Sequence, residues 1–565
     1  MAAKYYLNHI AGTCNSFDLY GNFYFMKKCR HLSFILLLLL SLLFIDGFTQ
    51  GAKENTADLS KAAHKGMLTD AVITSEGLLN FTYGMQVEKK SENLQYEDYT
   101  FDKDLAFKGM QASKVAKEDR PDKNVINLYA YAGGTSSFNV LSQKLSLQRE
   151  EWINTWNRKK QKYELGKRIS KETVKPKNDE GKYLGYVTYS AGEGEGAFIL
   201  SSYQPDKKGA DDIFQALFID MDLNIKATPI ITDGDYSLVY SGQLENDNIF
   251  VIMAPHKKMP NTSQYIYAEF TPKAELVKRS FFTSPSPNLL IMDYREVNGS
   301  LFLCAGSTKE NDAYNEVFPN YVTIGNPATG LSYHGGKYNQ EAYKRELANF
   351  HLLKFTKGDL AFATVVPIKS FKDKVVTPPS QRKAHTYEGK RLLIEEFKVL
   401  PDGGYLMAGQ LLDKDVVKDV QVTKYLDIVG FLFDANGGLR AQFAVEKMND
   451  DTKSEIWPSD QNFYISTDGK TAYWEILEVK GAKGYESFAD AYNGNKTYTF
   501  SYFPRIAKIN LAATTISEFD VLGSNGKYQM YKQHAALTSA DGKTRYYLGH
   551  DEDYEKVWIG KYSFQ

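Results

Sequence analysis

Short apolar runs separated by glycine-containing turns recur along most of this chain. The clearest stretch is 391–447, where four apolar runs are divided by the turn Asp402–Gly404, by a polar gap and by the turn Asn436–Gly438. Pairs of Asp or Asn with Gly supply the positive φ angles that tight hairpin turns need, so neighbouring runs fold back on each other. The stretch therefore predicts one antiparallel sheet of four strands.

The run Ile428–Phe433 within this unit is apolar on both faces rather than alternating. A strand with two apolar faces must be covered on both sides, which an isolated four-stranded sheet does not achieve. Weaker copies of the unit recur, and stacking such sheets in a ring covers both faces and leaves only short edges. The pattern predicts an all-β fold, a single β-propeller of about seven four-stranded antiparallel blades. Counts of six or eight blades, and a β-sandwich, are the alternatives.

The remaining blades are expected on both sides of 391–447. An insertion at 310–350 interrupts the fourth blade, and its tail, EAYKRELANF, is typical of a helix, so one short helical insertion is predicted. The basic segment Arg158–Lys182 is interpreted as a solvated loop or helical excursion, with phosphate or acidic-partner binding as the alternative. The predicted blades lie at 94–156, 183–231, 233–282, 289–367, 462–521 and 531–564.

The last blade ends after three strands. The strand predicted at Gly77–Gln86 supplies its fourth, since a propeller usually closes by pairing a strand from one terminus with the blade at the other. The propeller domain is accordingly predicted at 77–565, after a polar, flexible segment at 51–76.

The N-terminus carries an export pattern. Met26–Arg30 is basic, and Phe34–Ile45 is apolar except for one serine. This run is too short to span a bilayer and suits a signal peptide, predicted at 26–50, after a mis-chosen start at residues 1–25. A signal anchor is the alternative, and no later run is long enough for a transmembrane helix. Residues 1–50 are therefore interpreted as a leader, and the protein is expected in the periplasm or outside the cell.

Composition adds little to this picture. The formal net charge of −1 gives no reason to expect nucleic acid as a partner. Export normally permits disulfides, yet Cys304 is the only cysteine after the leader, so none is expected within the chain. Cys304 lies in an apolar run and is interpreted as core packing.

No reactive constellation stands out. The segment Asp220–Asn224 begins like a calcium loop but lacks the required later Gly and Glu, so a hairpin turn is favoured. Gly192–Gly196 lacks the Lys-Ser/Thr of a phosphate loop, and His550 lies in an acidic segment interpreted as an exposed loop. No catalytic, cofactor-binding or metal residue is assigned, and no cofactor is expected. A Ser/His/Asp or paired-carboxylate site assembled from distant blades stays open.

Two segments carry a recognisable motif. STDGKTAYW at Ser466–Trp474 and SADGKTRYYLG at Ser539–Gly549 resemble the S-x-D-G-K-x-x-Y repeat of periplasmic TolB-like and related WD40-like propellers. The resemblance covers chiefly residues 390–565. It implies a secreted or periplasmic propeller that acts through protein–protein contact at the bacterial envelope, and it carries over no catalytic residue.

The leading hypothesis is an exported, non-enzymatic propeller that binds another envelope or secreted protein as a scaffold. One alternative is a glycan-acting hydrolase or lyase with acidic residues at the mouth of the ring. The other is a carbohydrate-binding propeller without turnover. The sequence leaves open the ligand, the binding face and the oligomeric state.

Overall fold

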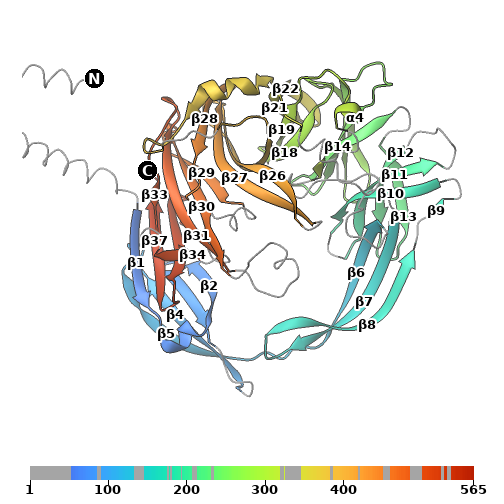
Figure 1. The fold of residues 1–565 in the computed structure, drawn as a ribbon. Coiled ribbons are helices and arrows are strands. Elements are labelled where there is room, and N and C mark those ends of the chain that lie inside the picture. Colours follow the sequence, from blue (N-terminus) through green and yellow to red (C-terminus); the bar gives the residue numbers. More distant parts are fainter. Residues whose placement is uncertain are drawn as a thin grey trace, which may run out of the picture.

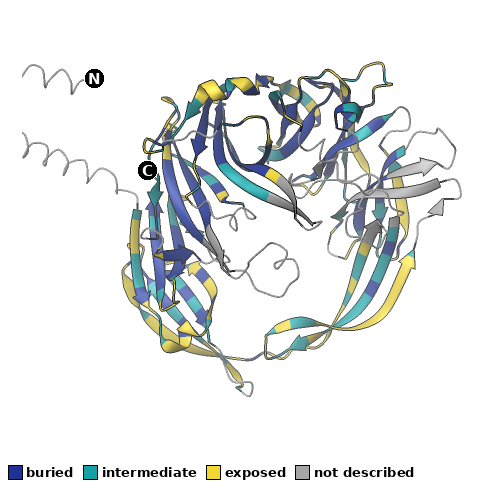
Figure 2. Ribbon diagram, in the orientation of Figure 1, coloured by how far each residue is buried: buried dark blue, intermediate teal, exposed yellow. Residues whose placement is uncertain are grey.

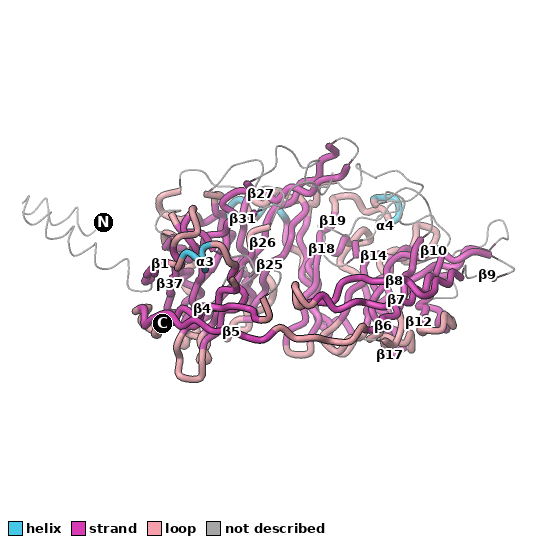
Figure 3. The backbone as a smooth tube through the Cα atoms, turned by 90° about the horizontal axis from the view of Figure 1, so that it is seen from below, coloured by secondary structure: helices cyan, strands magenta, loops and turns pink. Residues whose placement is uncertain are grey.

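Sheets arranged in a ring make up most of the molecule (Figure 1). The structure is a computed structural model. It describes residues 52–85, 91–132, 145–174, 177–178, 181–192, 194–205, 213–230, 235–318, 323–324, 345–381, 386–417, 420–448, 458–483, 499–523, 527–530 and 536–564. Seen from the side, the strands of most sheets run along the axis of the ring (Figure 3).

The predicted unit at 391–447 is confirmed as one four-stranded antiparallel sheet. It consists of β25 (Arg391–Val399), β26 (Tyr405–Val417), β27 (Val420–Phe433) and β28 (Leu439–Val445), paired in chain order. Gly403 and Gly437 in its two tight turns have φ of 83° and 75°, the left-handed region that glycine occupies without strain. The apolar run at the end of β27 is buried, as its two-sided pattern requires.

Six further four-stranded units can be counted among the described residues, which confirms a β-propeller of about seven blades. Two are β2 (Met67–Ile73), β3 (Leu79–Gly84), β4 (Asn93–Phe101), β5 (Phe107–Ala116), and β10 (Gly181–Ser190), β11 (Ala197–Pro205), β12 (Ile213–Ile219), β13 (Ile225–Pro229). Two more are β14 (Tyr236–Gln243), β15 (Ile249–Pro255), β16 (Gln264–Phe270), β17 (Leu276–Thr283), and β18 (Leu290–Val297), β19 (Ser300–Ser307), β21 (Asn349–Thr356), β22 (Asp359–Ala363).

The last two units form one continuous sheet. The first contains β29 (Asp460–Ile465), β30 (Thr471–Lys483), β31 (Thr499–Asn510) and the short β32 (Thr515–Ile516) and β33 (Asp520–Val521). The second contains β35 (Ala536–Thr538), β36 (Thr544–Asp551), β37 (Lys556–Ser563) and β1 (Ala52–Asp58). The strand β34 (Tyr528–Met530) pairs with both β31 and β36 and so joins them.

The ring is closed by β1 rather than by the strand predicted at Gly77–Gln86. β1 pairs antiparallel with β37 from Ala52↔Tyr562 to Asp58↔Lys556, while β3 lies between β2 and β4 in a sheet of its own. The flexible segment predicted at 51–76 was therefore wrong for residues 52–76, which hold β1, β2 and the short helix α3 (Lys61–His64). The sequence AKENTAD of β1 is mostly polar, because an edge strand is held by backbone pairing and needs few apolar side chains.

One sheet departs from the radial pattern. The strands β6 (Lys123–Ala132), β7 (Leu145–Asn157) and β8 (Lys162–Val174) form a three-stranded sheet whose strands run in the plane of the ring (Figures 1 and 3). The predicted blade at 94–156 is thus divided between two sheets. The basic segment 158–182 is mostly strand rather than loop or helix, because β8 pairs with β7 along its length. Figure 2 shows that β5 and β8 are largely exposed.

The core lies between the sheets. A continuous apolar cluster joins the blades that begin with β14, β18 and β25, and aromatic side chains such as Phe302, Phe350 and Phe431 pack within it. The first strands of neighbouring blades touch one another, β14 with β18, β18 with β25, and β25 with β29. In Figure 1, β18 lies at the inside of the ring and β22 at its outside. The first strands of these blades therefore lie nearest the centre of the molecule.

Small elements complete the loops. The helix α4 (Tyr314–Val317) lies in the insertion after β19, at its start rather than at the predicted tail, whose described residues 345–350 are loop and the first residues of β21. The 3-10 helices η1 (Ile368–Ser370) and η2 (Lys372–Lys374) follow β23 (Val366–Pro367). The remaining short strands are β9 (Lys177–Asn178), β20 (Thr323–Ile324) and β24 (Val375–Val376). Over the described ranges, no helix has the length and apolar character that crossing a membrane requires.

Candidate functional site

Five of the first strands carry a one-residue bulge at the same place. The register shifts in β2, β10, β14, β18 and β25 where each pairs with the second strand of its blade. A bulge leaves the extra residue outside the ladder and re-aims its side chain, and bulges are common beside functional sites. The extra residues are Thr69, Tyr186, Val239, Met292 and Glu395.

Glu395 is the only acidic residue among these five. Burial raises the pKa of its carboxyl group to about 7, and the Asp460 carboxylate, followed by that of Asp293, pushes in the same direction, while the Arg295 guanidinium opposes them. Near neutral pH this carboxyl group is therefore divided between its protonated and ionised forms. A carboxyl group of this kind can both give and take a proton.

Asp293 lies directly after the bulge of the neighbouring strand β18. Burial raises the pKa of its carboxyl group to about 6, against the influence of Arg295. Its Oδ1 accepts a hydrogen bond from the backbone N–H of Tyr294 at 2.8 Å, and its Oδ2 lies 3.0 Å from the guanidinium of Arg295. Arg295 also donates to the carbonyl of Ile394 and so ties β18 to β25 beside Glu395.

The same arrangement repeats one blade later. Glu396 follows the bulge of β25 and accepts from the backbone N–H of Phe397 at 2.9 Å, as Asp293 does from Tyr294. Lys398 lies 3.5 Å from Glu396 and takes the place of Arg295. An acidic residue with a basic residue two positions later is thus repeated in the first strands β18 and β25. Glu395, at the bulge itself, has no acidic counterpart in β18.

Asp293 and Glu395 open into one cavity of about 710 Å³, called here the inner-strand pocket. It is bounded by the turn after β14, by Asp293–Glu296 on β18 and by Leu393–Glu395 on β25. Glu245, Asp247 and Glu296 also line it, and among the described residues of its wall Arg295 is the single cation. Such a pocket offers many hydrogen-bond acceptors and suits a ligand that brings hydroxyl donors.

Aromatic and acidic groups adjoin Glu395 from the next blades. Tyr425 on β27 is half-buried, and its pKa is raised by burial and then by the Glu395 carboxylate. Asp460 begins β29, the first strand of the following blade, and it contributes to the raised pKa of Glu395. Burial, and secondarily Asp460, also raises the pKa of Tyr502 to about 12. Three successive first strands thus supply a carboxyl group each: Asp293, Glu395 and Asp460.

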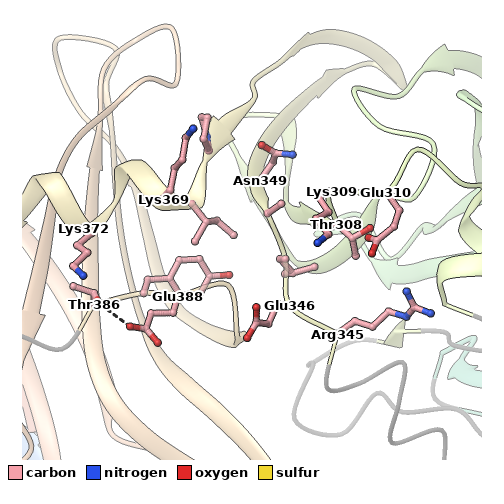
Figure 4. Close-up of a pocket in the computed structure, with 15 residues that line it drawn as sticks. Thr308, Lys309, Glu310, Arg345, Glu346, Asn349, Lys369, Lys372, Thr386 and Glu388 are labelled. Carbon is pink, nitrogen blue, oxygen red and sulfur yellow. Dashed lines mark hydrogen bonds between the residues drawn. The ribbon is translucent and has the colours of Figure 1, made fainter.

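A second cavity, of about 930 Å³, lies at the ends of the blades that begin with β18 and β25 (Figure 4). It is called here the loop-face pocket. Its walls are Thr308–Glu310, Arg345–Asn349, Pro367–Lys369, Lys372 and Thr386–Glu388. The chain segments that leave β19, enter β21 and connect β23 with β25 therefore converge on it.

A Ser–His–Asp contact occurs at the start of β14. The Oγ of Ser237 lies 2.7 Å from Nε2 of His256, whose Nδ1 lies 3.4 Å from Oδ1 of Asp235. Lys258 binds the other oxygen of Asp235 at 3.1 Å. The three residues join the start of one strand to the chain just after the next, so the contact fastens the end of a single blade rather than distant blades.

The structure places the other residues singled out from the sequence away from both pockets. Cys304 is fully buried against Met407, and burial raises the pKa of its thiol, which confirms its role in the core. Asp220 caps the turn between β12 and β13 by accepting from the backbone N–H groups of Asp222 and Asn224, the predicted hairpin turn.

His550 is mostly buried and stacks on Tyr554, so the predicted exposed loop is wrong at this residue. Within the described ranges, no three His, Cys, Asp or Glu residues gather as metal ligands would.

Neither Asp293 nor Glu395 was singled out from the sequence, although a signal is present. The segments 289–297 and 392–399 both begin Leu-Leu-Ile and continue with Asp or Glu after the same interval. Aligning the repeats places Met292 opposite Glu395 and Asp293 opposite Glu396, with a base two residues further on in each copy. The burial that raises the pKa values depends on the neighbouring blades and has no local signal.

Comparison with known proteins assigns no family to the chain. No protein-family model and no curated protein matches the chain. Similar solved structures include an α-L-arabinanase from Penicillium chrysogenum in complex with arabinobiose, 12% identical over 57% of this chain and 98% of that one, with a TM-score of 0.18. The α-L-arabinofuranosidase Arb93A from Fusarium graminearum is 8% identical over 92% and 98%, with a TM-score of 0.19. The N-terminal domain of Nup159 is 7% identical over 79% and 98%, with a TM-score of 0.23. Likenesses this distant carry no argument about function.

Proposed function

We propose that this β-propeller is a glycan-acting hydrolase whose chemistry takes place in the inner-strand pocket. The observation that carries the proposal is the pair Asp293 and Glu395, two carboxyl groups on adjacent first strands with pKa values raised to about 6 and about 7. Glycoside hydrolysis commonly uses two carboxyl groups on opposite sides of the scissile bond, one of them kept protonated near neutral pH.

The two carboxyl groups take different roles. Glu395, with the higher pKa, donates its proton to the glycosidic oxygen as the C–O bond breaks. Asp293, with a pKa of about 6 beside Arg295, is mostly ionised at neutral pH and takes a proton from the water that attacks the anomeric carbon. The products are two sugars with free hydroxyl groups, and the proton on Asp293 returns to Glu395 through solvent. Lyase chemistry at the same pair is the closest variant, with Asp293 removing a carbon-bound proton instead.

A protein-binding role is the second candidate. It is favoured by apolar side chains that are exposed on β5 and β8, including Met110, Val115 and Leu165. These strands lie at sheet edges, where pairing with another chain is available.

In either role we expect the protein to be exported, because of the basic and apolar segments at 26–50.

Product release from a panel of plant and bacterial polysaccharides tests the proposal. We expect Glu395→Gln and Asp293→Asn each to lower the rate by at least about 100-fold, the usual contribution of a general acid or base. Glu275→Gln, at an exposed ion pair with Lys226, is the matched control and should keep the wild-type rate. Full activity in Glu395→Gln, or no product from any polysaccharide with a folded protein, would count against the proposal. Stoichiometric cross-linking to one envelope protein would then favour the second candidate.

A further inference from the structure

We propose that the loop-face pocket is a binding site for the carboxylate-bearing sugar of an acidic glycan, a uronic-acid unit. This site is separate from the carboxyl pair of the inner-strand pocket, and binding in it requires no turnover. The argument rests on the charges, the buried hydroxyl and the apolar surface of the pocket walls (Figure 4).

Two lysines supply the charge for a carboxylate. Lys369 in η1 and Lys372 in η2 lie on one wall of the pocket. Neither side chain makes an ion pair or hydrogen bond with any residue in the part of the chain that the structure describes. Both side chains are exposed at the pocket wall, so a bound carboxylate can pair with either ammonium group.

The opposite wall contains a buried hydroxyl group. Thr308 is 4% exposed, and its Oγ1 makes no hydrogen bond of normal length and angle. It does lie near enough to Glu310 to lower the pKa of that carboxyl group, together with the backbone N–H of Glu310 itself and the charges of Arg345 and Lys309. A buried polar atom without a partner is costly, so a ligand hydroxyl group at Thr308 is favoured.

The acidic residues of the walls restrict the kind of anion. Glu346 and Glu388 also line the pocket, and Glu388 accepts a hydrogen bond of 3.3 Å from Thr386. Their carboxylates repel a phosphate dianion more strongly than a single carboxylate, and they accept hydrogen bonds from hydroxyl groups. A ligand with one carboxylate and several hydroxyl groups satisfies both lysines and glutamates.

The remaining walls suit a sugar ring. Leu347, Ile368 and Tyr387 are buried residues that line the pocket, and the Tyr387 hydroxyl is already committed to the carbonyl of Lys390 at 3.0 Å. Apolar walls of this kind pack against the C–H faces of sugars. The volume of about 930 Å³ lies within the range of about 300–1,000 Å³ that small-molecule sites occupy.

Calorimetric titration with a short oligogalacturonate and with its methyl-esterified form tests the site, because the two ligands differ only in their carboxylates. We expect the free acid to bind and the ester to bind at least about tenfold more weakly, the loss of a charge-assisted hydrogen bond. The double variant Lys369→Ala/Lys372→Ala should weaken binding of the acid to the level of the ester. Thr308→Val should weaken binding of both ligands, because the hydroxyl partner is lost from each.

Two controls separate this proposal from the hydrolase. Lys226→Ala removes an exposed lysine elsewhere and should leave binding unchanged. Glu395→Gln should bind the oligogalacturonate normally even where it abolishes turnover. Equal affinity for acid and ester, unchanged affinity in a double variant that melts like the wild type, or no binding of the acid would each overturn the proposal.

Discussion

Thr69, Tyr186, Val239 and Met292 occupy the bulges that correspond to Glu395, and none of them carries a carboxyl group. In β25 the bulge holds Glu395 instead, so an ionisable group lies at a position that the neighbouring blades partly shield from water. Desolvation disfavours its charged form, and the carboxylates of Asp460 and Asp293 add to that effect. At the residue scale, one side chain in a repeated position thus supplies the proton donor of the proposed reaction.

The stability of the protein should depend on pH through Glu395. Its folded pKa of about 7 lies above its ordinary value, so the stabilisation is fully present at acidic pH and is lost as the pH rises through about 7. The neutral variant Glu395→Gln escapes this loss. We expect its free energy of unfolding to exceed that of the wild type by on the order of 1–3 kcal/mol near pH 8, and the difference to shrink near pH 5.

Thermal melting of the two proteins across this pH range measures the effect. Asp293 adds a loss of its own at lower pH, through its folded pKa of about 6. A difference in melting temperature that stays constant from about pH 5 to about pH 8 would contradict a folded pKa of about 7 for Glu395.

At the scale of elements, β1 shows how little apolar content a strand at the edge of a blade requires. Its seven residues contain few buried side chains, and its sequence lacks the alternation that marks β3. Glu54 nevertheless accepts hydrogen bonds from Trp558 Nε1 at 2.9 Å and from the backbone N–H of Gly523 at 3.1 Å. The closing strand was therefore missed, because its partners lie about 500 residues away in the sequence. The strand β3 was chosen in its place because its apolar and polar residues alternate clearly, yet it lies in the interior of another sheet.

Removal of β1 should loosen the last blade. We expect a chain that starts at residue 59 to melt several degrees below one that starts at residue 52, since β37 loses its antiparallel partner and Trp558 loses Glu54. The chain starting at residue 52 is the control, because it lacks only residues that precede β1. Melting at the same temperature would contradict closure by β1.

At the scale of the whole molecule, the repeat of apolar runs and Gly turns was sufficient to predict an all-β ring of about seven blades. The blade at 391–447 was predicted closely, because Asp402–Gly404 and Asn436–Gly438 fix its turns. The sheet of β6–β8 was not, because the basic residues of β8 hide a strand whose exposed side chains need no apolar pattern. The two pockets were also beyond reach, since each is assembled from segments of different blades.

The protonation state of Glu395 is the central claim of this account, and infrared difference spectroscopy of the carboxyl C=O stretch between about pH 5 and about pH 9 measures it directly. We predict a protonated carboxyl band that disappears near pH 7 in the wild type and is absent from Glu395→Gln, whereas the band of Asp293 is present in both proteins at lower pH. Identical spectra for the two proteins over this range would contradict it, because Glu395 would then be an ordinary ionised glutamate.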